Sequence, residues 1–348
     1  MHIFMKKTIK STSVNIAALA ACYGLMSFRV TAESIYLESI IFVISIYVLV
    51  SAAGKFTTLS VTVGKSLGLS KLATGILIIA IGTSAPELFA SIGAAIQHRP
   101  NMVVGNVLGT VVANSLLGIG CGALVATRPL SVHKGVFGTQ MSIFLAAIML
   151  SIGGLYIGGL VWYEGLIMVV LLVCYLCYVI KSPNNDNVVT EDSNHSEKAE
   201  SSMLGIVVLL TINLGALFVS GDFVISSLIE SAKLLGLSDT KLATSVLAVG
   251  TSIPEIATAI VLVRQNNADS LFGEIIGSNI FDLLGILGVI SLFGNLSIDS
   301  NLLVFLSVSI FLMFLVTSTI MNDKRINRLE GISLISLFVI FTIQLVNV

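Results

Sequence analysis

The sequence predicts an all-α protein that crosses a membrane many times. Hydrophobic residues make up 55% of the 348 residues and charged residues only 11%, against roughly 25% charged in ordinary soluble domains. The apolar residues run in long unbroken stretches, whereas the strands of a membrane β-barrel alternate at every second residue. Basic and acidic residues nearly balance, at 18 and 19, so no surplus of positive charge indicates nucleic-acid binding. This composition excludes a water-soluble globular protein.

Residues 1–32 form a unit of their own. Three lysines precede an apolar stretch at 14–28, and residues 30–32 (Val-Thr-Ala) resemble the small-residue site at which signal peptides are cleaved. The alternative is a retained extra helix, which Arg29 and the shortness of the stretch disfavour. The sequence leaves both interpretations open.

Ten apolar segments follow, each long enough to span a bilayer as a helix. They lie near residues 36–53, 72–97, 103–125, 137–157, 162–180, 203–229, 242–263, 271–293, 302–320 and 331–347. The strongly polar stretch between the fifth and sixth contains acidic residues among Asn and Ser, which is typical of a flexible linker. We therefore expect a first five-helix repeat at 33–181, a linker at 182–202 and a second five-helix repeat at 203–348.

Basic residues predict the orientation, because cytoplasmic loops of membrane proteins are enriched in Lys and Arg. The loops on one side, which include the linker, carry eleven basic residues, and those on the other side carry four. This places the linker in the cytoplasm and the C-terminus outside, most simply across the plasma (inner) membrane. Trp162 and Tyr163 are predicted to lie at a membrane–water interface.

An internal repeat relates the two halves. The motif at 82–87 (GTSAPE) recurs at 250–255 (GTSIPE), 168 residues later. The same shift relates 105–114 (GNVLGTVVAN) to 273–282 (GEIIGSNIFD). Since each copy contains five segments, an odd number, the second copy enters the membrane from the opposite side. Such inverted repeats are found in many secondary transporters, with the binding site near the midplane where the copies meet.

Glu87 and Glu255 are the most informative residues of the motif. Each lies inside an apolar run, where a carboxylate is costly and tolerated mainly when it faces a polar cavity or a cation. A protonated glutamate bonded to a neighbouring helix is the alternative, and the duplication beside the same hydroxyls disfavours it. Thr83 and Ser84 precede Glu87 by four and three residues, on the same helix face. Pro86 lacks an N–H, so we expect a kink or break that frees backbone carbonyls.

The next segments contribute a second polar pair in each copy. Thr110 and Asn114 are four residues apart and share a helix face, as do Ser278 and Asp282. The Gly-x-x-x-Gly spacings at 105–109 and 273–277 permit close helix approach.

The resulting group of residues contains two Glu and one Asp without an intramembrane Lys or Arg, so the balancing charge must be a proton or a metal cation. Hydroxyl, carbonyl and carboxylate oxygens suit hard cations such as Ca²⁺, whereas softer metals prefer His or Cys. Cys174 and Cys177 form a CxxC with no nearby His, and we expect them to pack inertly in the core.

These motifs resemble the two α-repeats of the calcium/cation antiporter superfamily, and most nearly its prokaryotic sodium/calcium exchangers. The resemblance covers about residues 36–348. It implies ten helices, alternating access and exchange of cytoplasmic Ca²⁺ for external Na⁺, hence a transporter with no catalytic residues and no cofactor. Ca²⁺, Na⁺ and the lipid bilayer are then its partners, and an oligomeric partner is left unassigned.

The resemblance also assigns roles by motif position. Glu87 and Glu255 would be the central Ca²⁺ ligands, with Thr83 and Thr251 contributing to the Ca²⁺ and Na⁺ sites. Four hydroxyls would form the flanking Na⁺ sites: Ser84, Ser252, Thr110 and Ser278. Asn114 and Asp282 would line the middle, and Ala80 and Ala248 would offer backbone carbonyls.

The sequence departs from the family pattern in two places. The first copy reads GTVVAN at 109–114 where GSNIFN is usual, and Glu274 stands where Asn is expected. Both departures bear on ion preference.

Three other functions share some of these sequence features. An intramembrane hydrolase is disfavoured because a serine nucleophile needs a nearby base, and the four histidines fall in predicted tails or loops. A channel on the same fold and a Ca²⁺/H⁺ or K⁺-dependent exchanger stay as alternatives. The six hydroxyls exceed what one Ca²⁺ site uses, which favours Na⁺ coupling. Since three carboxylates in one cavity repel each other, Asp282 is expected to stay protonated.

Overall fold

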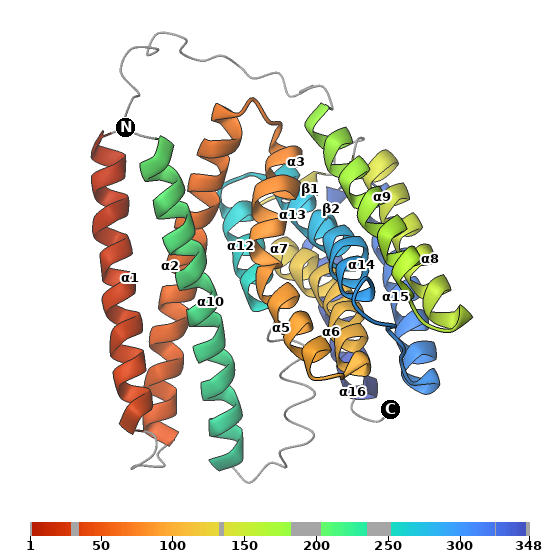
Figure 1. Cartoon of the computed structure of the whole chain (residues 1–348). Coiled ribbons are helices and arrows are strands. Elements are labelled where there is room, and N and C mark those ends of the chain that lie inside the picture. The colour runs from red at the N-terminus through yellow and green to blue at the C-terminus, as the bar shows by residue number, and fades with distance from the viewer. Residues whose placement is uncertain are drawn as a thin grey trace.

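A computed structural model describes residues 2–28, 35–131, 136–181, 203–234, 252–323 and 325–345, and it shows a bundle of long helices (Figure 1). Within these ranges, eight helices are long and apolar enough to cross a membrane, or nine if the bent pair 71–83 and 85–96 counts as one span. The all-α, many-span fold class is therefore confirmed. The predicted segment at 242–263 begins among residues outside these ranges.

The first half contains several helices that are interrupted by widened, π-helical turns. Its elements are α2 (Ile35–Ser66), α3 (Lys71–Thr74), η1 (Gly75–Ala80), α4 (Ile81–Thr83), α5 (Ala85–Ile96), α6 (Pro100–Ala113), η2 (Asn114–Gly118), α7 (Ile119–Val125), β1 (Leu130–Ser131), η3 (Val136–Gln140), α8 (Met141–Ile157) and α9 (Trp162–Lys181).

The described part of the second half contains one such widened turn, η4. The elements of this half are α10 (Met203–Leu234), α12 (Ile253–Arg264), α13 (Ala268–Ile280), η4 (Phe281–Ile286), α14 (Leu287–Ser291), α15 (Ser300–Asn322), β2 (Arg325–Ile326) and α16 (Arg328–Leu345).

The helix α2 is longer than predicted. The sequence places Lys55 and Lys65 in a loop after a segment ending at 53, but both lie inside α2. The Lys55 ammonium donates to the Ser51 hydroxyl at 3.0 Å, and the hydroxyls of Thr58 and Thr62 donate to carbonyls one turn back. Polar side chains are thus satisfied on the helix itself, so nothing ends it before Ser66. With a rise of 1.5 Å per residue, its 32 residues span about 48 Å.

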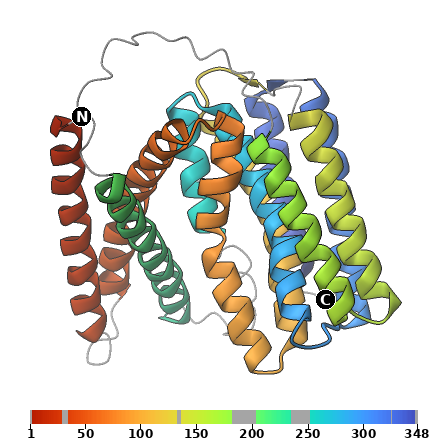
Figure 2. The same cartoon turned by 45° about the horizontal axis from the view of Figure 1, so that its top comes forward.

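The two central spans are the most buried. In an apolar 18-residue stretch of each unbroken span, 83% and 89% are buried for 100–125 and 268–291, whereas the share is at most half for the others. Figures 1 and 2 show α1 (His2–Phe28), α2 and α10 along one side of the bundle and α8, α9 and α15 along the other. The second polar pair of each repeat therefore lies on the helices that are best shielded from lipid.

Two short backbone pairings close opposite ends of the bundle. At one end β1 pairs antiparallel with β2, in the register Leu130–Ile326. At the other end Leu160 and Leu296 exchange N–H···O bonds of 2.9 and 3.0 Å. The helices α8 and α15 each run from one pairing to the other. A shift of 168 residues maps the Leu160–Leu296 pair onto positions 328 and 128, next to the strand pair, as an inverted repeat requires.

The helix α1 packs against α2 and α10. The Asn213 amide donates to the Thr12 hydroxyl at 3.1 Å, and the Cys22 thiol and Ser45 hydroxyl lie 3.8 Å apart. All four side chains are buried. The N-terminal segment thus contributes polar contacts to the bundle as well as apolar ones.

Cys174 and Cys177 are exposed on α9, and both are free thiols. The prediction that they pack in the core is wrong. A helix that faces lipid is apolar on every side, so composition does not reveal which of its faces is buried.

Candidate cation-binding site

The first motif breaks its helix as predicted. The axes of 71–83 and 85–96 differ by 41°, and the break falls at Ser84. Pro86 occupies the first turn of α5, where its missing N–H costs no helical hydrogen bond. Glu87 follows in the same turn, and its side chain is completely buried.

The described part of the second motif, from Ser252 onward, has the same geometry. Ser252 precedes α12 with φ −84° and ψ 0°, close to the −79° and 4° of Ser84. Pro254 and Glu255 again lie in the first turn of the helix, and both are buried. Thr251 and Ala248 lie outside the described residues, so their assigned roles stay predictions.

The structure brings the polar residues of the two copies together. Glu87, Glu255 and Asp282 are close enough to interact electrostatically. Thr83 faces Glu255, and Ser84 faces Asp282, so hydroxyls of the first copy face carboxylates of the second. The predicted ligands within the described ranges are all buried: Ala80, Thr83, Ser84, Glu87, Thr110, Asn114, Ser252, Glu255, Ser278 and Asp282.

Many of these polar atoms have no hydrogen-bond partner among the described residues. They are both carboxylate oxygens of Glu87, Glu255 and Asp282, both amide atoms of Asn114, and the hydroxyls of Ser84 and Ser252. A buried polar atom without a partner costs about 1–3 kcal/mol, and more when it is charged. This set of oxygen ligands fits a hard cation as the transported substrate, because carboxylate, hydroxyl and amide oxygens can all coordinate such an ion at once.

The carbonyl of Ala80 lies where the two copies touch. The Thr83 hydroxyl is 3.2 Å from this oxygen, and the Ser278 hydroxyl is 3.5 Å from it. Ala80 ends η1, the π-helical turn that precedes the first motif. Widened turns recur at equivalent places, since η2 begins at Asn114 and η4 contains Asp282. Such turns are frequent at functional sites, and sequence periodicity did not reveal them.

Two helices of different copies cross in backbone contact. A Cβ added to Gly273 would lie 2.4 Å from the carbonyl oxygen of Leu72, and one on Gly277 would lie 3.0 Å from Cα of Ile76. The predicted close approach is therefore confirmed for 273–277. The repeat counterparts of Leu72 and Ile76 are residues 240 and 244, which lie outside the described residues. The close helix approach at 105–109 therefore stays a prediction.

Some buried polar residues near the site were not assigned from the sequence. Glu274 and Thr258 are completely buried and bonded to each other. The Asn279 amide donates to the Ser115 hydroxyl at 2.7 Å, joining α13 to η2. The signal for Glu274 was present, because it is an acid in an apolar run like Glu87.

No compact group of three His, Cys, Asp or Glu side chains arranged to hold a metal occurs in the described part of the chain. The site consists of carboxylates with hydroxyl and amide oxygens between them. Of the histidines, His98 lies in the turn between α5 and α6 and His2 in α1, while His133 and His195 lie in ranges without description.

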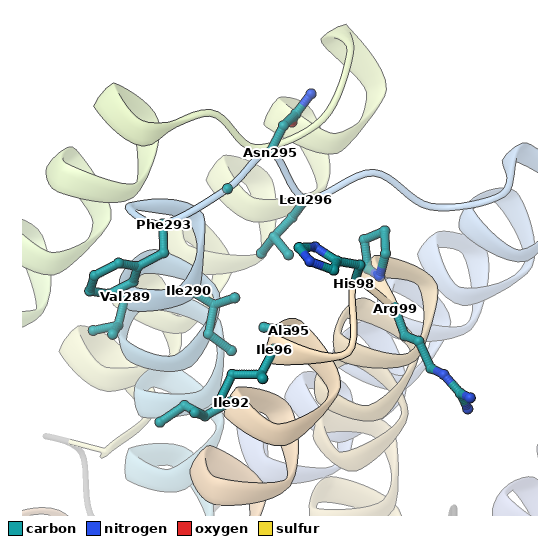
Figure 3. A pocket seen from close by; sticks show the side chains of 12 residues that line it. Ile92, Ala95, Ile96, His98, Arg99, Val289, Ile290, Phe293, Asn295 and Leu296 are labelled. Atoms are coloured by element: carbon teal, nitrogen blue, oxygen red, sulfur yellow. The ribbon is translucent and has the colours of Figure 1, made fainter.

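A cavity of about 820 Å³ lies at the ends of α5 and α14 (Figure 3). Its lining is mainly apolar and includes Ile92, Ile96, Val289, Ile290 and Phe293. None of the candidate ligands lines it. The size of this cavity therefore does not identify the cation site. The assignment of the cation site rests on the buried polar atoms.

Residues 37–181 and 205–346 match the protein family described as sodium/calcium exchanger protein. The chain is 28% identical over 341 residues to the sodium/calcium exchanger MaX1 of Methanosarcina acetivorans, covering 88% of this chain and 97% of the relative. It is 28% identical over 268 residues to the inner membrane protein YrbG of Escherichia coli, covering 76% and 82%. Its fold is similar to that of the sodium-calcium exchanger NCX_Mj, with a TM-score of 0.73 and 26% identity over 88% of this chain and 98% of that chain.

Proposed function

Because the chain belongs to the sodium/calcium exchanger protein family, we propose that it exchanges Ca²⁺ for Na⁺ at the cluster around Glu87 and Glu255. It is a multi-span membrane transporter rather than an enzyme, and such transport needs no cofactor. The observation that carries the site assignment is the pair of buried glutamates, one from each copy, whose oxygens have no partner among the described residues.

Charge arithmetic gives each carboxylate a role. The two negative charges of Glu87 and Glu255 balance one Ca²⁺. Asp282 faces the Ser84 hydroxyl in the same cluster. With a proton on Asp282, the site is neutral when Ca²⁺ is bound. When Na⁺ replaces Ca²⁺, the hydroxyls supply extra oxygen ligands. A neutral filled site avoids most of the cost of holding charge in an apolar surrounding.

Alternating access is proposed from the symmetry of the two copies. In each copy a helix starts just after an equivalent serine and carries an equivalent glutamate in its first turn. The copies enter from opposite sides, so two related routes lead to one fixed site. Such an arrangement suits a transporter that opens one route at a time.

The direct test is Ca²⁺ uptake into proteoliposomes that contain the purified protein. An outwardly directed gradient of Na⁺, of K⁺ or of H⁺ is imposed in separate experiments. We expect Na⁺ to drive Ca²⁺ uptake at clamped pH. Uptake driven by a pH step and indifferent to Na⁺ would identify a Ca²⁺/H⁺ exchanger. Uptake that requires K⁺ would identify a K⁺-dependent exchanger. Ca²⁺ flux that requires no counter-ion would identify a channel.

Ser84→Ala or Ser252→Ala should weaken Na⁺ dependence more than Ca²⁺ affinity. Both hydroxyls are buried and without partners among the described residues, and removing one Na⁺ ligand is expected to cost about 1.4 kcal/mol, or tenfold. The half-saturating Na⁺ concentration should rise about tenfold while that for Ca²⁺ stays within about threefold. Ser307→Ala is the control, because this buried hydroxyl donates to its own helix, at the Leu303 carbonyl. An unchanged Na⁺ dependence in both variants would remove these hydroxyls from the Na⁺ sites.

We also propose that α1 is retained as a membrane helix, with the linker cytoplasmic and the C-terminus outside. The buried Thr12–Asn213 contact supports retention, since polar contacts between membrane helices stabilise their association by about 0.6 kcal/mol. Epitope tags before residue 1, within 182–202 and after residue 348 test this. The first two should be accessible from the cytoplasm and the third from outside. Loss of the first tag from the purified protein would mean that the N-terminal segment is cleaved. Finding the linker and the C-terminus on the same side of the membrane would contradict the inverted repeat.

A further inference from the structure

The cavity at the ends of α5 and α14 has apolar walls and a basic rim. The walls are branched apolar side chains from one helix of each copy: Ile92 and Ile96 of α5, and Val289 and Ile290 of α14 (Figure 3). The turn after α5 adds His98 and Arg99 to the lining, and both side chains are exposed. The volume of about 820 Å³ lies within the range of about 300–1,000 Å³ that is typical of small-molecule sites. An apolar body with a cationic end matches an amphiphile that has a negatively charged head.

The basic rim lies at the depth of lipid headgroups. Leu296 lines the cavity and exchanges backbone hydrogen bonds with Leu160. Two residues after Leu160, α9 begins with Trp162 and Tyr163, whose side chains are exposed. Tryptophan and tyrosine are enriched where a membrane meets water. From this level the cavity extends toward the membrane interior, since Ile92 lies four residues, or about 6 Å, before the end of α5.

The cavity suits a lipid chain better than the transported ions. The four side chains of its walls offer no oxygen ligand, and hard cations require several. Ile96 and Phe293, at its edge, are 74% and 87% exposed. In a chain that spans a bilayer, large apolar side chains exposed at this depth lie against acyl chains rather than water. A lipid can therefore enter the cavity from the bilayer.

At the equivalent place in the repeat, the helices pack together. A shift of 168 residues relates Ile290 of α14 to Gly122 of α7. A Cβ added to Gly122 would lie 3.3 Å from a side-chain carbon of Val263 and 3.5 Å from one of Leu271, so α7 packs against α12 and α13 there. Isoleucine at position 290 adds a branched side chain between α14 and α5, and these two helices touch less. The cavity at this end thus follows from a difference in sequence between the copies.

The charge on the turn beside the cavity is not shared by its repeat counterpart. The turns after α5 and after α12 have the same backbone conformation, because His98 and Asn266 both have φ 54°. The side chains differ, since Asn266 and Asn267 stand where the other turn has His98 and Arg99. Of these two turns, only the one that lines the cavity carries a guanidinium.

We propose that this cavity binds an anionic phospholipid, with one acyl chain between α5 and α14 and the phosphate at Arg99. The planar guanidinium can donate two parallel N–H bonds to phosphate oxygens, and a ring N–H of His98 adds a further donor. A zwitterionic headgroup also carries a positive group beside its phosphate, which Arg99 repels. The occupant is a lipid because the spans place the cavity within reach of a bilayer. The candidate cation ligands take no part, so the inference stands independently of the proposed function.

Native mass spectrometry of the purified full-length protein tests the proposal. Phosphatidylglycerol and phosphatidylcholine with the same acyl chains are titrated in separate experiments, without Ca²⁺ or Na⁺. The wild type should bind one phosphatidylglycerol about tenfold more tightly than phosphatidylcholine, as one charge-assisted hydrogen bond predicts. Phosphatidylglycerol should also raise the melting temperature in detergent, because a ligand of the native state stabilises it.

Three variants separate the headgroup contact from the cavity. Arg99→Gln should lower the affinity for phosphatidylglycerol about tenfold, to that for phosphatidylcholine. Arg264→Gln is the matched control and should bind like the wild type, because this exposed arginine ends α12, the repeat counterpart of α5. Ala95→Phe fills the cavity and should remove binding of both lipids. Ile92→Trp takes its place if that variant does not fold.

Each of three results would overturn the inference. They are equal affinity of the wild type for the two lipids, equal loss of affinity in Arg99→Gln and Arg264→Gln, and tight lipid binding that survives the filled cavity. The last result would place the lipid elsewhere on the surface. None of these measurements depends on Ca²⁺ exchange, so a failure here leaves the proposed function to its own test.

Discussion

Glu87→Gln or Glu255→Gln is expected to abolish Ca²⁺ exchange while leaving the protein folded. Each carboxylate supplies one of the two charges that balance Ca²⁺, and an amide supplies none. Unit charges about 4 Å apart attract by about 4 kcal/mol at an effective dielectric constant of 20, which corresponds to on the order of 10³ in affinity. Neither glutamate makes a side-chain hydrogen bond among the described residues, so the amide breaks none.

The measurement is Na⁺-driven Ca²⁺ uptake into proteoliposomes, with the melting temperature of each variant taken in detergent. Glu330→Gln is the matched control, since this half-buried carboxylate lies in the first turn of α16 and accepts from the backbone N–H of Asn327. It should transport normally. Near wild-type uptake by either site variant would show that the site has been misplaced.

Gly75→Ala and Gly273→Ala should disrupt assembly of the two repeats. A Cβ on Gly75 would lie 2.4 Å from the Ser270 carbonyl oxygen, and one on Gly273 would lie 2.4 Å from that of Leu72. Backbone atoms of two helices cannot turn aside as a side chain can, so the helices must separate. Overpacking of this kind costs about 1–3 kcal/mol or more. Because the crossing also positions Ser278 against Ala80, transport should be lost together with stability.

The melting temperature and the yield of monodisperse protein measure this effect. Gly153→Ala on α8 is the control, because no described atom lies within 4 Å of the added Cβ. The control should melt like the wild type, since alanine is also the better helix former. A Gly273→Ala protein with wild-type stability and uptake would mean that α3 and α13 do not cross in backbone contact.

The class of protein and the position of the motifs could be read from the sequence. The membrane class follows from composition, because a bilayer admits only apolar spans with satisfied backbones. The break before Glu87 follows from Pro86, whose missing N–H acts within one helical turn. The shift of 168 residues between the motifs related Glu87 to Glu255 before any fold was known. These properties are local or repeated along the chain, and they need no knowledge of neighbouring helices.

The contacts between copies were decided only by the tertiary structure. Nothing in the sequence pairs Thr83 with Glu255, or shows that Gly273 touches the backbone of Leu72. The exposure of Cys174 was predicted wrongly for the same reason. In a chain with apolar residues on nearly every helix face, periodicity does not distinguish lipid from protein. Packing alone decides which face is buried, and with it which acids, Glu274 included, come near the cation site.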